Sequence, residues 1–170
     1  MRRRVMQAGR AAMRGFTLVE LMVALVVAAI LLAVAVPAFD NFVVSSRLRT
    51  VANSLSASVQ LAKSEAMKRN AAVTLCKSAN GTSCVTSGGW EQGWIVLSGS
   101  TVLRRQQALP SGYQVSSSTN ALSFRPSGMG STQATLTACR ASPLGREERV
   151  VTVSATGRAM VEKTTVGSCS

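Results

Sequence analysis

A long apolar run near the start of the chain limits what it can fold into. Leu21 to Val36 are sixteen apolar residues without interruption, and the 21 residues from Phe16 to Val36 would form about 31 Å of helix, enough to span a bilayer. The first fifteen residues contain no acid and five arginines, namely Arg2, Arg3, Arg4, Arg10 and Arg14. The positive-inside rule keeps these arginines in the cytoplasm, so the chain after Pro37 is expected on the other side of the membrane.

One carboxylate interrupts this apolar character. Glu20 lies four residues after Phe16, where a charge in or near hydrocarbon is unfavourable unless it has a partner. If the chain is cut between Gly15 and Phe16, the new Phe16 ammonium is a cation at matching depth. Glu20 of one subunit would then pair with Phe16 of a neighbour, which would set the register of packed helices.

The segment Arg14-Gly15-Phe16-Thr17-Leu18-Val19-Glu20, with the apolar run and Pro37 behind it, resembles the leader of type IV pilins and type II secretion pseudopilins. The resemblance implies cleavage after Gly15 by the prepilin peptidase, methylation of the Phe16 amine and assembly through Phe16 and Glu20. Two other interpretations are a secretory signal peptide cut after Ala33-Val34-Ala35, and an uncleaved single-pass anchor.

After Pro37 the apolar residues recur at spacings of three and four, which predicts an amphipathic helix to about Asn70. The predicted buried stripe is Val44, Leu48, Val51, Leu55, Val59, Ala62 and Ala66. We therefore expect four segments: a leader at 1–15, a transmembrane and filament-core helix at 16–36, its amphipathic continuation at 37–70 and a β-rich periplasmic head at 71–170.

From residue 71 short β-branched and apolar runs alternate with Gly, Ser and Asn clusters, which predicts an antiparallel sheet. The expected strands are Ala72–Lys77, Trp94–Ser98, Thr101–Ala108, Gly112–Ser116, Ala121–Arg125, Ala134–Arg140, Arg149–Ser154 and Arg158–Lys163, with turns at Gly99 and Gly157. The predicted fold class is α+β, a long N-terminal helix packed on a sandwich-like antiparallel head.

Three blocks of the head, 89–97, 122–128 and 150–158, resemble in that order those of the GspH/FimT family of minor pilins and minor pseudopilins. Trp90 and Trp94 in the first block are expected in the core, because the chain has few aromatic residues and Trp buries a large area.

The four cysteines are even in number and lie in the part expected to face an oxidising compartment, which predicts two disulfides. We favour Cys76 with Cys84 and Cys139 with Cys169 among the three possible pairings. Metal binding is not expected, since the chain has no His and no closely spaced cysteine pair.

We interpret the protein as a non-enzyme without a cofactor. The absence of His excludes Ser-His catalysis, and the one adjacent acid pair, Glu147 and Glu148, is expected in a solvated charged turn.

The net charge is +12 for the whole chain; beyond residue 15, the remaining 14 bases and 7 acids give +7. Such a charge attracts polyanions. Some members of the GspH/FimT family, which this chain resembles, are similar to DNA receptors that carry a Gly-Arg-x-Arg motif. Here the corresponding residues are Gly157-Arg158-Ala159-Met160, which match the first Arg of the motif but not the second. The candidate DNA contacts are Arg158, Lys163, Arg149, Arg104 and Arg105.

The leading hypothesis is a minor pilin precursor, held in the bacterial inner membrane with a periplasmic head until it joins other pilin subunits in a filament. The alternatives are an H-type minor pseudopilin of type II secretion and a DNA-binding pilin of natural transformation.

Overall fold

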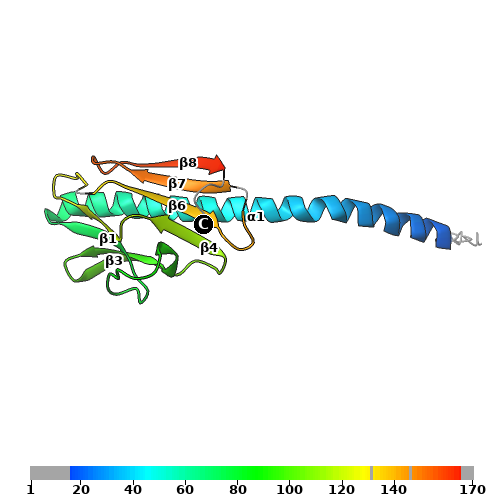
Figure 1. The fold of residues 1–170 in the computed structure, drawn as a ribbon, viewed down its shortest axis with the longest axis horizontal. Coiled ribbons are helices and arrows are strands. Elements are labelled where there is room, and N and C mark those ends of the chain that lie inside the picture. The colour runs from blue at the N-terminus through cyan, green and yellow to red at the C-terminus, as the bar shows by residue number, and fades with distance from the viewer. Residues whose placement is uncertain (1–15, 131, 146, 166–170) are drawn as a thin grey trace, which may run out of the picture. The chain divides into compact units, whose positions relative to one another are not determined.

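The structure is a computed structural model that describes residues 16–130, 132–145 and 147–165. Its contacts divide the chain into two units, residues 1–39 and 40–170. One helix, α1 (Leu18–Arg69), contributes to both units and is followed by eight strands (Figure 1).

Both ends of α1 carry recognisable caps. At the start, the Glu20 backbone N–H donates to Thr17 Oγ1 at 3.2 Å, which satisfies one of the amides that a helix leaves unpaired. At the end, Asn70 adopts a φ of +49°, and the Ala71 N–H donates to the Ala66 carbonyl at 3.3 Å. Asn tolerates this left-handed conformation, which turns the chain out of the helix.

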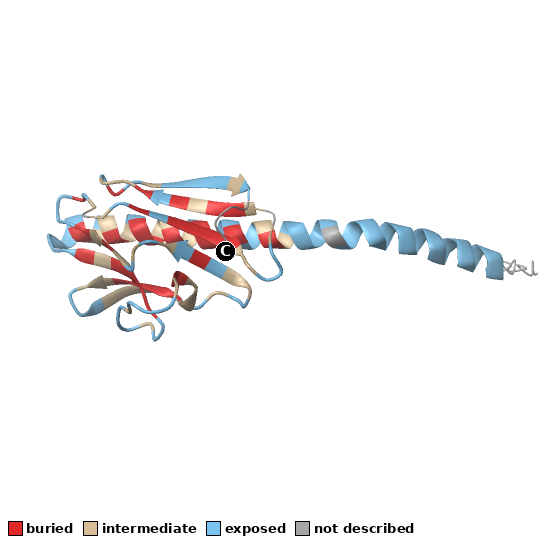
Figure 2. Cartoon of the chain, viewed as in Figure 1, coloured by how far each residue is buried: buried red, intermediate tan, exposed pale blue. Residues whose placement is uncertain are grey.

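The second half of α1 supplies one side of the hydrophobic core. All seven residues of the predicted stripe are buried. Figure 2 shows red bands of buried residues along this half of α1, whereas the other half is pale blue. They pack against apolar residues from both sheets, including Leu75, Leu122 and Val151. The predicted amphipathic helix and its packing on the head are confirmed.

The strands are β1 (Val73–Lys77), β2 (Trp94–Ser98), β3 (Thr101–Gln106), β4 (Tyr113–Ser117), β5 (Ala121–Phe124), β6 (Ala134–Arg140), β7 (Glu147–Val153) and β8 (Ala159–Thr165). They form two four-stranded sheets with the orders β3-β2-β1-β5 and β4-β6-β7-β8, and every pairing is antiparallel. The predicted α+β class is thus confirmed, and each predicted strand has a counterpart whose bounds differ by at most two residues.

Both tryptophans are 1% exposed, which confirms their predicted place in the core. Trp90 opens a short 3-10 helix, η1 (Trp90–Gln92), which was not predicted. Its indole N–H donates to the Thr119 carbonyl at 2.9 Å, while that of Trp94 donates to Ser58 Oγ on α1 at 3.0 Å. Each ring therefore buries its area without leaving its single donor unpaired.

Candidate assembly and processing site

The N-terminal part of α1 presents an apolar surface that this chain does not cover. Every described residue from Phe16 to Val36 is exposed, and the Phe16 residue, just before the helix, is 72% exposed. Among the described residues, α1 is the one helix long and apolar enough to cross a membrane. Exposed apolar surface of this extent is unfavourable in water, so the segment has the length and composition of a membrane-spanning helix.

Phe16 and Glu20 both lie at this apolar end. Phe16 precedes α1, and Glu20 is the acid in its first helical turn. Gly15, the residue before the predicted cleavage site, lies outside the described residues. Cleavage after Gly15, methylation of Phe16 and pairing between subunits stay predictions.

Thr17 is a residue of this segment that the sequence reasoning missed. Its hydroxyl caps α1 and accepts the amide of Glu20, three residues further on. The spacing of Thr17 and Glu20 is that of a capping box, in which the N-cap hydroxyl bonds to the amide of an acidic residue at the third helical position. This Thr-x-x-Glu signal before an apolar run was present in the sequence.

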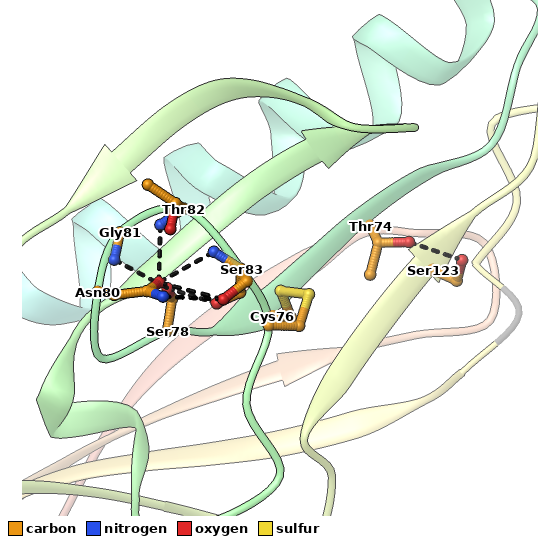
Figure 3. The surroundings of a disulfide bond; sticks show 9 residues. Thr74, Cys76, Ser78, Asn80, Gly81, Thr82, Ser83 and Ser123 are labelled. Carbon is orange, nitrogen blue, oxygen red and sulfur yellow. Dashed lines mark hydrogen bonds between the residues drawn. A yellow bond between two sulfur atoms is a disulfide. The ribbon is translucent and has the colours of Figure 1, made fainter.

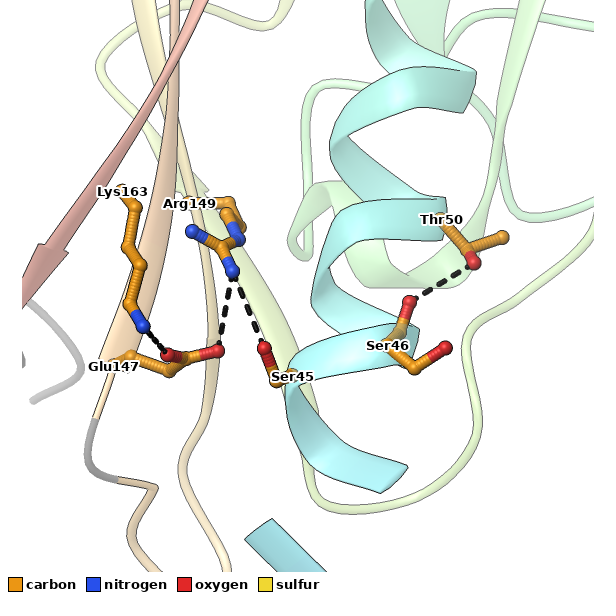
Figure 4. A network of polar contacts seen from close by, with 6 residues as sticks. All are labelled: Ser45, Ser46, Thr50, Glu147, Arg149 and Lys163. Carbon is orange, nitrogen blue, oxygen red and sulfur yellow. Dashed lines mark hydrogen bonds and ion pairs between the residues drawn. The ribbon is translucent and has the colours of Figure 1, made fainter. Parts of the chain in front are cut away.

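Four side chains join the head half of α1 to β7 and β8 (Figure 4). Arg149 Nη2 donates to Ser45 Oγ on α1 at 3.2 Å and to Glu147 Oε1 at 3.3 Å. Lys163 on β8 pairs with the second carboxylate oxygen of Glu147. We call Ser45, Glu147, Arg149 and Lys163 the helix–sheet clamp, because together they tie one helix and two strands.

The charges of this clamp favour the ionised form of Glu147. Partial burial alone would raise the pKa of Glu147, but hydrogen bonds from Lys163 and Ser45 and the charges of Arg149 and Lys163 outweigh it. The pKa of Glu147 is therefore held below its usual value.

The expectation of a solvated turn at Glu147 and Glu148 is wrong. Both residues belong to β7, where Glu147 pairs with Thr165 and Glu148 with Thr164, and Glu148 is only 2% exposed. The strand begins two residues earlier than predicted, because Glu147 and Glu148 continue the antiparallel pairing of β7 with β8. Among the residues described, no three Cys, Asp or Glu side chains are placed to hold a metal ion.

The structure separates the candidate DNA contacts. Arg104 and Arg105 lie on β3 in one sheet, whereas Lys163 lies on β8 in the other and Arg158 directly precedes β8. The Arg149 side chain is 6% exposed and paired with Glu147, and Lys163 is paired with the same carboxylate, so a phosphate would have to compete with Glu147 for either residue. DNA binding through the five residues stays a prediction.

The turn that carries Arg158 is held by contacts the sequence did not reveal. Lys63 Nζ on α1 donates to the Thr156 carbonyl at 2.8 Å, across 93 residues of sequence. Gly157 has a φ of +69°, and a Cβ there would lie 3.0 Å from the Gly128 carbonyl oxygen. Gly157 is thus needed both for its backbone conformation and for close packing, which fits its place in a block that resembles the family.

A disulfide joins Cys76 on β1 to Cys84, as one half of the favoured pairing predicts (Figure 3). The loop between them is ordered by Asn80, whose side-chain oxygen accepts the amides of Thr82 and Ser83 at 2.9 and 3.0 Å. Cys169, the predicted partner of Cys139, lies outside the described residues, so that pairing stays a prediction.

Comparisons with known proteins bear on both parts of the chain. The family model for the type II transport protein GspH matches residues 51–157, and a prokaryotic N-terminal methylation motif matches residues 10–36. No match is found among curated proteins.

Among solved structures, two crystal forms of the type IV minor pilin FimU from Pseudomonas aeruginosa are similar to this chain. They have TM-scores of 0.56 and 0.57 at 21% identity, and cover 72% and 76% of this chain and 99% of FimU. The minor pseudopilin EpsH from the type 2 secretion system of Vibrio cholerae has a TM-score of 0.47 at 14% identity, covering 69% of this chain and 95% of EpsH.

The likeness to FimU shows the same fold, a long helix with an antiparallel head. The methylation motif covers Phe16, Glu20 and the exposed apolar segment, and the GspH model covers more than half of the chain. The protein therefore belongs to the GspH family of minor pilins and minor pseudopilins.

Proposed function

We propose that the protein is the precursor of a minor pilin that takes part in assembling a type IV pilus. The prepilin peptidase cuts after Gly15 and the Phe16 amine is methylated. The mature chain waits in the inner membrane with its head in the periplasm, and then joins other pilin subunits. Its role is structural and involves no catalysed reaction.

The observation that carries this proposal is the exposed apolar surface from Phe16 to Val36 with one carboxylate near its start. Lipid can cover the apolar side chains, but it offers Glu20 no fixed cation. A neighbouring subunit covers the same surface and brings its own Phe16 ammonium. The segment is therefore suited to exchange lipid for identical or related helices.

The test is to co-express the full chain with a prepilin peptidase and the other minor subunits of its host, and to measure its intact mass and co-purification. We expect a mature chain that begins at a methylated Phe16. Glu20→Gln should reduce co-purification with other subunits at least tenfold while leaving cleavage intact, since the interchain ion pair is lost.

Glu65→Gln, which removes a carboxylate from the head end of the same helix, is the matched control and should co-purify as the unchanged protein does. A mature chain that begins elsewhere than Phe16, or a Glu20→Gln variant that assembles normally, would refute the proposal.

A second candidate, an H-type pseudopilin of type II secretion, is favoured by the description of the matching family model. The same experiment separates the two functions. Co-purified pilus subunits support the first and co-purified secretion pseudopilins the second, and the genes beside that of the protein should agree with the outcome.

A further inference from the structure

A pocket of about 350 Å³ lies between the head half of α1 and the turn that joins β6 to β7. Asp40, Asn41 and Val44 line it from α1; Arg140, Leu144 and Glu147 line it from the two strands and their turn. The clamp already neutralises Glu147 through Arg149 and Lys163. The charges that remain to meet a ligand are Asp40 and Arg140.

These two residues form an ion pair at the pocket. Arg140 Nη1 donates to both oxygens of Asp40, at 3.3 and 3.1 Å. The Asp40 side chain is 61% exposed, whereas that of Arg140 is 18% exposed. A guanidinium has five N–H donors, and these two bonds use one nitrogen only. The cation is thus fixed in the wall while its anionic partner faces solvent.

The wall that holds Arg140 is built rather than loosely placed. The Gly145 N–H donates to the Arg140 carbonyl at 2.8 Å, and a Cβ on Gly145 would lie 3.2 Å from Arg140 Cβ. Ala141, the residue after Arg140, donates its N–H to the Gly112 carbonyl at 2.8 Å. The turn is therefore held from both sides against the end of β6.

The position of this pocket along the chain places it near lipid headgroups. Asp40 follows Val36, the last residue of the apolar run, by four residues, and four residues reach at most about 14 Å. At the turn, Leu144 is 64% exposed, an apolar side chain beside a charged pocket. Such a side chain is stabilised when acyl chains rather than water surround it.

We propose that this pocket binds the headgroup of a zwitterionic phospholipid, phosphatidylethanolamine, in the periplasmic leaflet. The phosphate binds the Arg140 guanidinium, the ammonium binds the Asp40 carboxylate, and Leu144 contacts the acyl chains. The ion pair between Arg140 and Asp40 is replaced by two ion pairs with the headgroup, so no charge is left unpaired. An anionic headgroup without an ammonium would pair with Arg140 but would leave the Asp40 carboxylate without a cation.

This inference rests on the proposed function, in which the mature chain is anchored in the inner membrane before assembly. It adds a specific lipid contact that positions the head at the bilayer surface. The ethanolamine ammonium has three N–H donors for Asp40, whereas a choline group has none. The pocket should therefore prefer phosphatidylethanolamine to both phosphatidylcholine and phosphatidylglycerol.

The test uses the full chain in detergent micelles with equimolar dipalmitoyl phosphatidylethanolamine, phosphatidylcholine and phosphatidylglycerol, and native mass spectrometry to identify bound lipid. We expect phosphatidylethanolamine to dominate. Arg140→Gln should lower its occupancy about tenfold, since charge-assisted hydrogen bonds are lost, and Asp40→Asn should remove the preference over phosphatidylcholine.

Arg104→Gln, the same charge change on β3 of the other sheet, is the control and should bind lipid as the unchanged chain does. Arg140→Lys keeps the cation and is the second variant if Arg140→Gln fails to fold; it should retain binding to phosphate but with lower occupancy. Equal binding of all three lipids, or equal occupancy in Arg140→Gln and Arg104→Gln, overturns the inference.

The two proposals fail separately in this experiment. A chain that begins at Phe16 but shows no preference for phosphatidylethanolamine overturns the pocket alone. A chain that does not begin at Phe16 but prefers this lipid supports the pocket and refutes the processing that the proposed function requires.

Discussion

At the scale of single residues, Ser58 and Trp94 make a fully buried hydrogen bond inside the core. Ser58 is fully buried; its hydroxyl accepts the indole N–H of Trp94 and donates to the Ser54 carbonyl at 2.8 Å. We predict that Ser58→Ala destabilises the head by about 1–3 kcal/mol, because the buried indole N–H loses its acceptor. Urea unfolding of a fragment of residues 40–170 measures this change.

Ser64→Ala is the control for that prediction. Ser64 also donates to a carbonyl of α1, that of Leu61 at 3.0 Å, but it is exposed to water. Its replacement should change the free energy of unfolding by less than about 0.5 kcal/mol. Equal effects of the two substitutions would contradict the role given to Ser58.

Glu147 should make the stability of the head depend on acidic pH. Its pKa is lowered in the folded state from an ordinary value of 4.5, so its stabilisation is complete above that pH and is lost as the pH falls through the folded pKa. Glu147→Gln should be less stable at neutral pH and should lose less stability on acidification. Urea unfolding at several pH values from about 7 down to about 3 measures both effects.

Glu162→Gln removes an exposed carboxylate from the neighbouring strand β8 and serves as the comparison. It should follow the pH dependence of the unchanged head. If Glu147→Gln does the same, the clamp does not depend on the charge of Glu147.

At the scale of elements, two hairpin turns each contain a glycine with positive φ. Comparing Gly→Ala variants of the two turns separates the cost of backbone strain from the cost of steric overlap. Gly99 and Gly157 have φ values of +58° and +69°, but a Cβ on Gly99 would meet no atom within 4 Å. On Gly157 it would approach Gly128, Phe124 and Lys63 at 3.0 to 3.3 Å. Gly99→Ala should therefore lower the free energy of unfolding by about 1–2 kcal/mol, which is the strain of the left-handed conformation alone.

Gly157→Ala should lower the free energy of unfolding by at least about 1 kcal/mol more than Gly99→Ala does, because steric overlap of the new Cβ adds to the same backbone strain. Thermal and urea unfolding of the two variants measure the difference. Equal destabilisation would mean that the turn before β8 has room to move away from α1.

At the scale of the whole molecule, the core and the apolar end belong to different units. The core cluster lies between Val44 and Val153, within the unit of residues 40–170. We predict that the fragment of residues 40–170 is monomeric without detergent and unfolds in one cooperative transition, whereas the full chain requires detergent. Analytical ultracentrifugation and urea unfolding test this. Aggregation of the fragment, or a monomeric full chain without detergent, would contradict it.

Much of this architecture could be predicted from local patterns. Spacings of three and four marked the buried face of α1, because they follow the period of a helix. Short β-branched and apolar runs between Gly, Ser and Asn clusters marked every strand, because the first residues favour extended structure and the second favour turns. The segment from Arg14 to Glu20 indicated a pilin or pseudopilin, and the three head blocks at 89–97, 122–128 and 150–158 indicated the GspH/FimT family. The missed helix η1 is only three residues long, too short for any period to show.

The sequence by itself therefore determined the class of protein, the long helix with its buried face, the eight strands and the two core tryptophans, since these depend on the order of residues along one stretch of chain. Only the tertiary structure decided which distant groups meet. Arg149 became part of the clamp with Ser45, 104 residues away, and Arg140 met Asp40 across 100 residues. Such contacts arise when strands pair and pack on a helix, and no local pattern records which side chains then face one another.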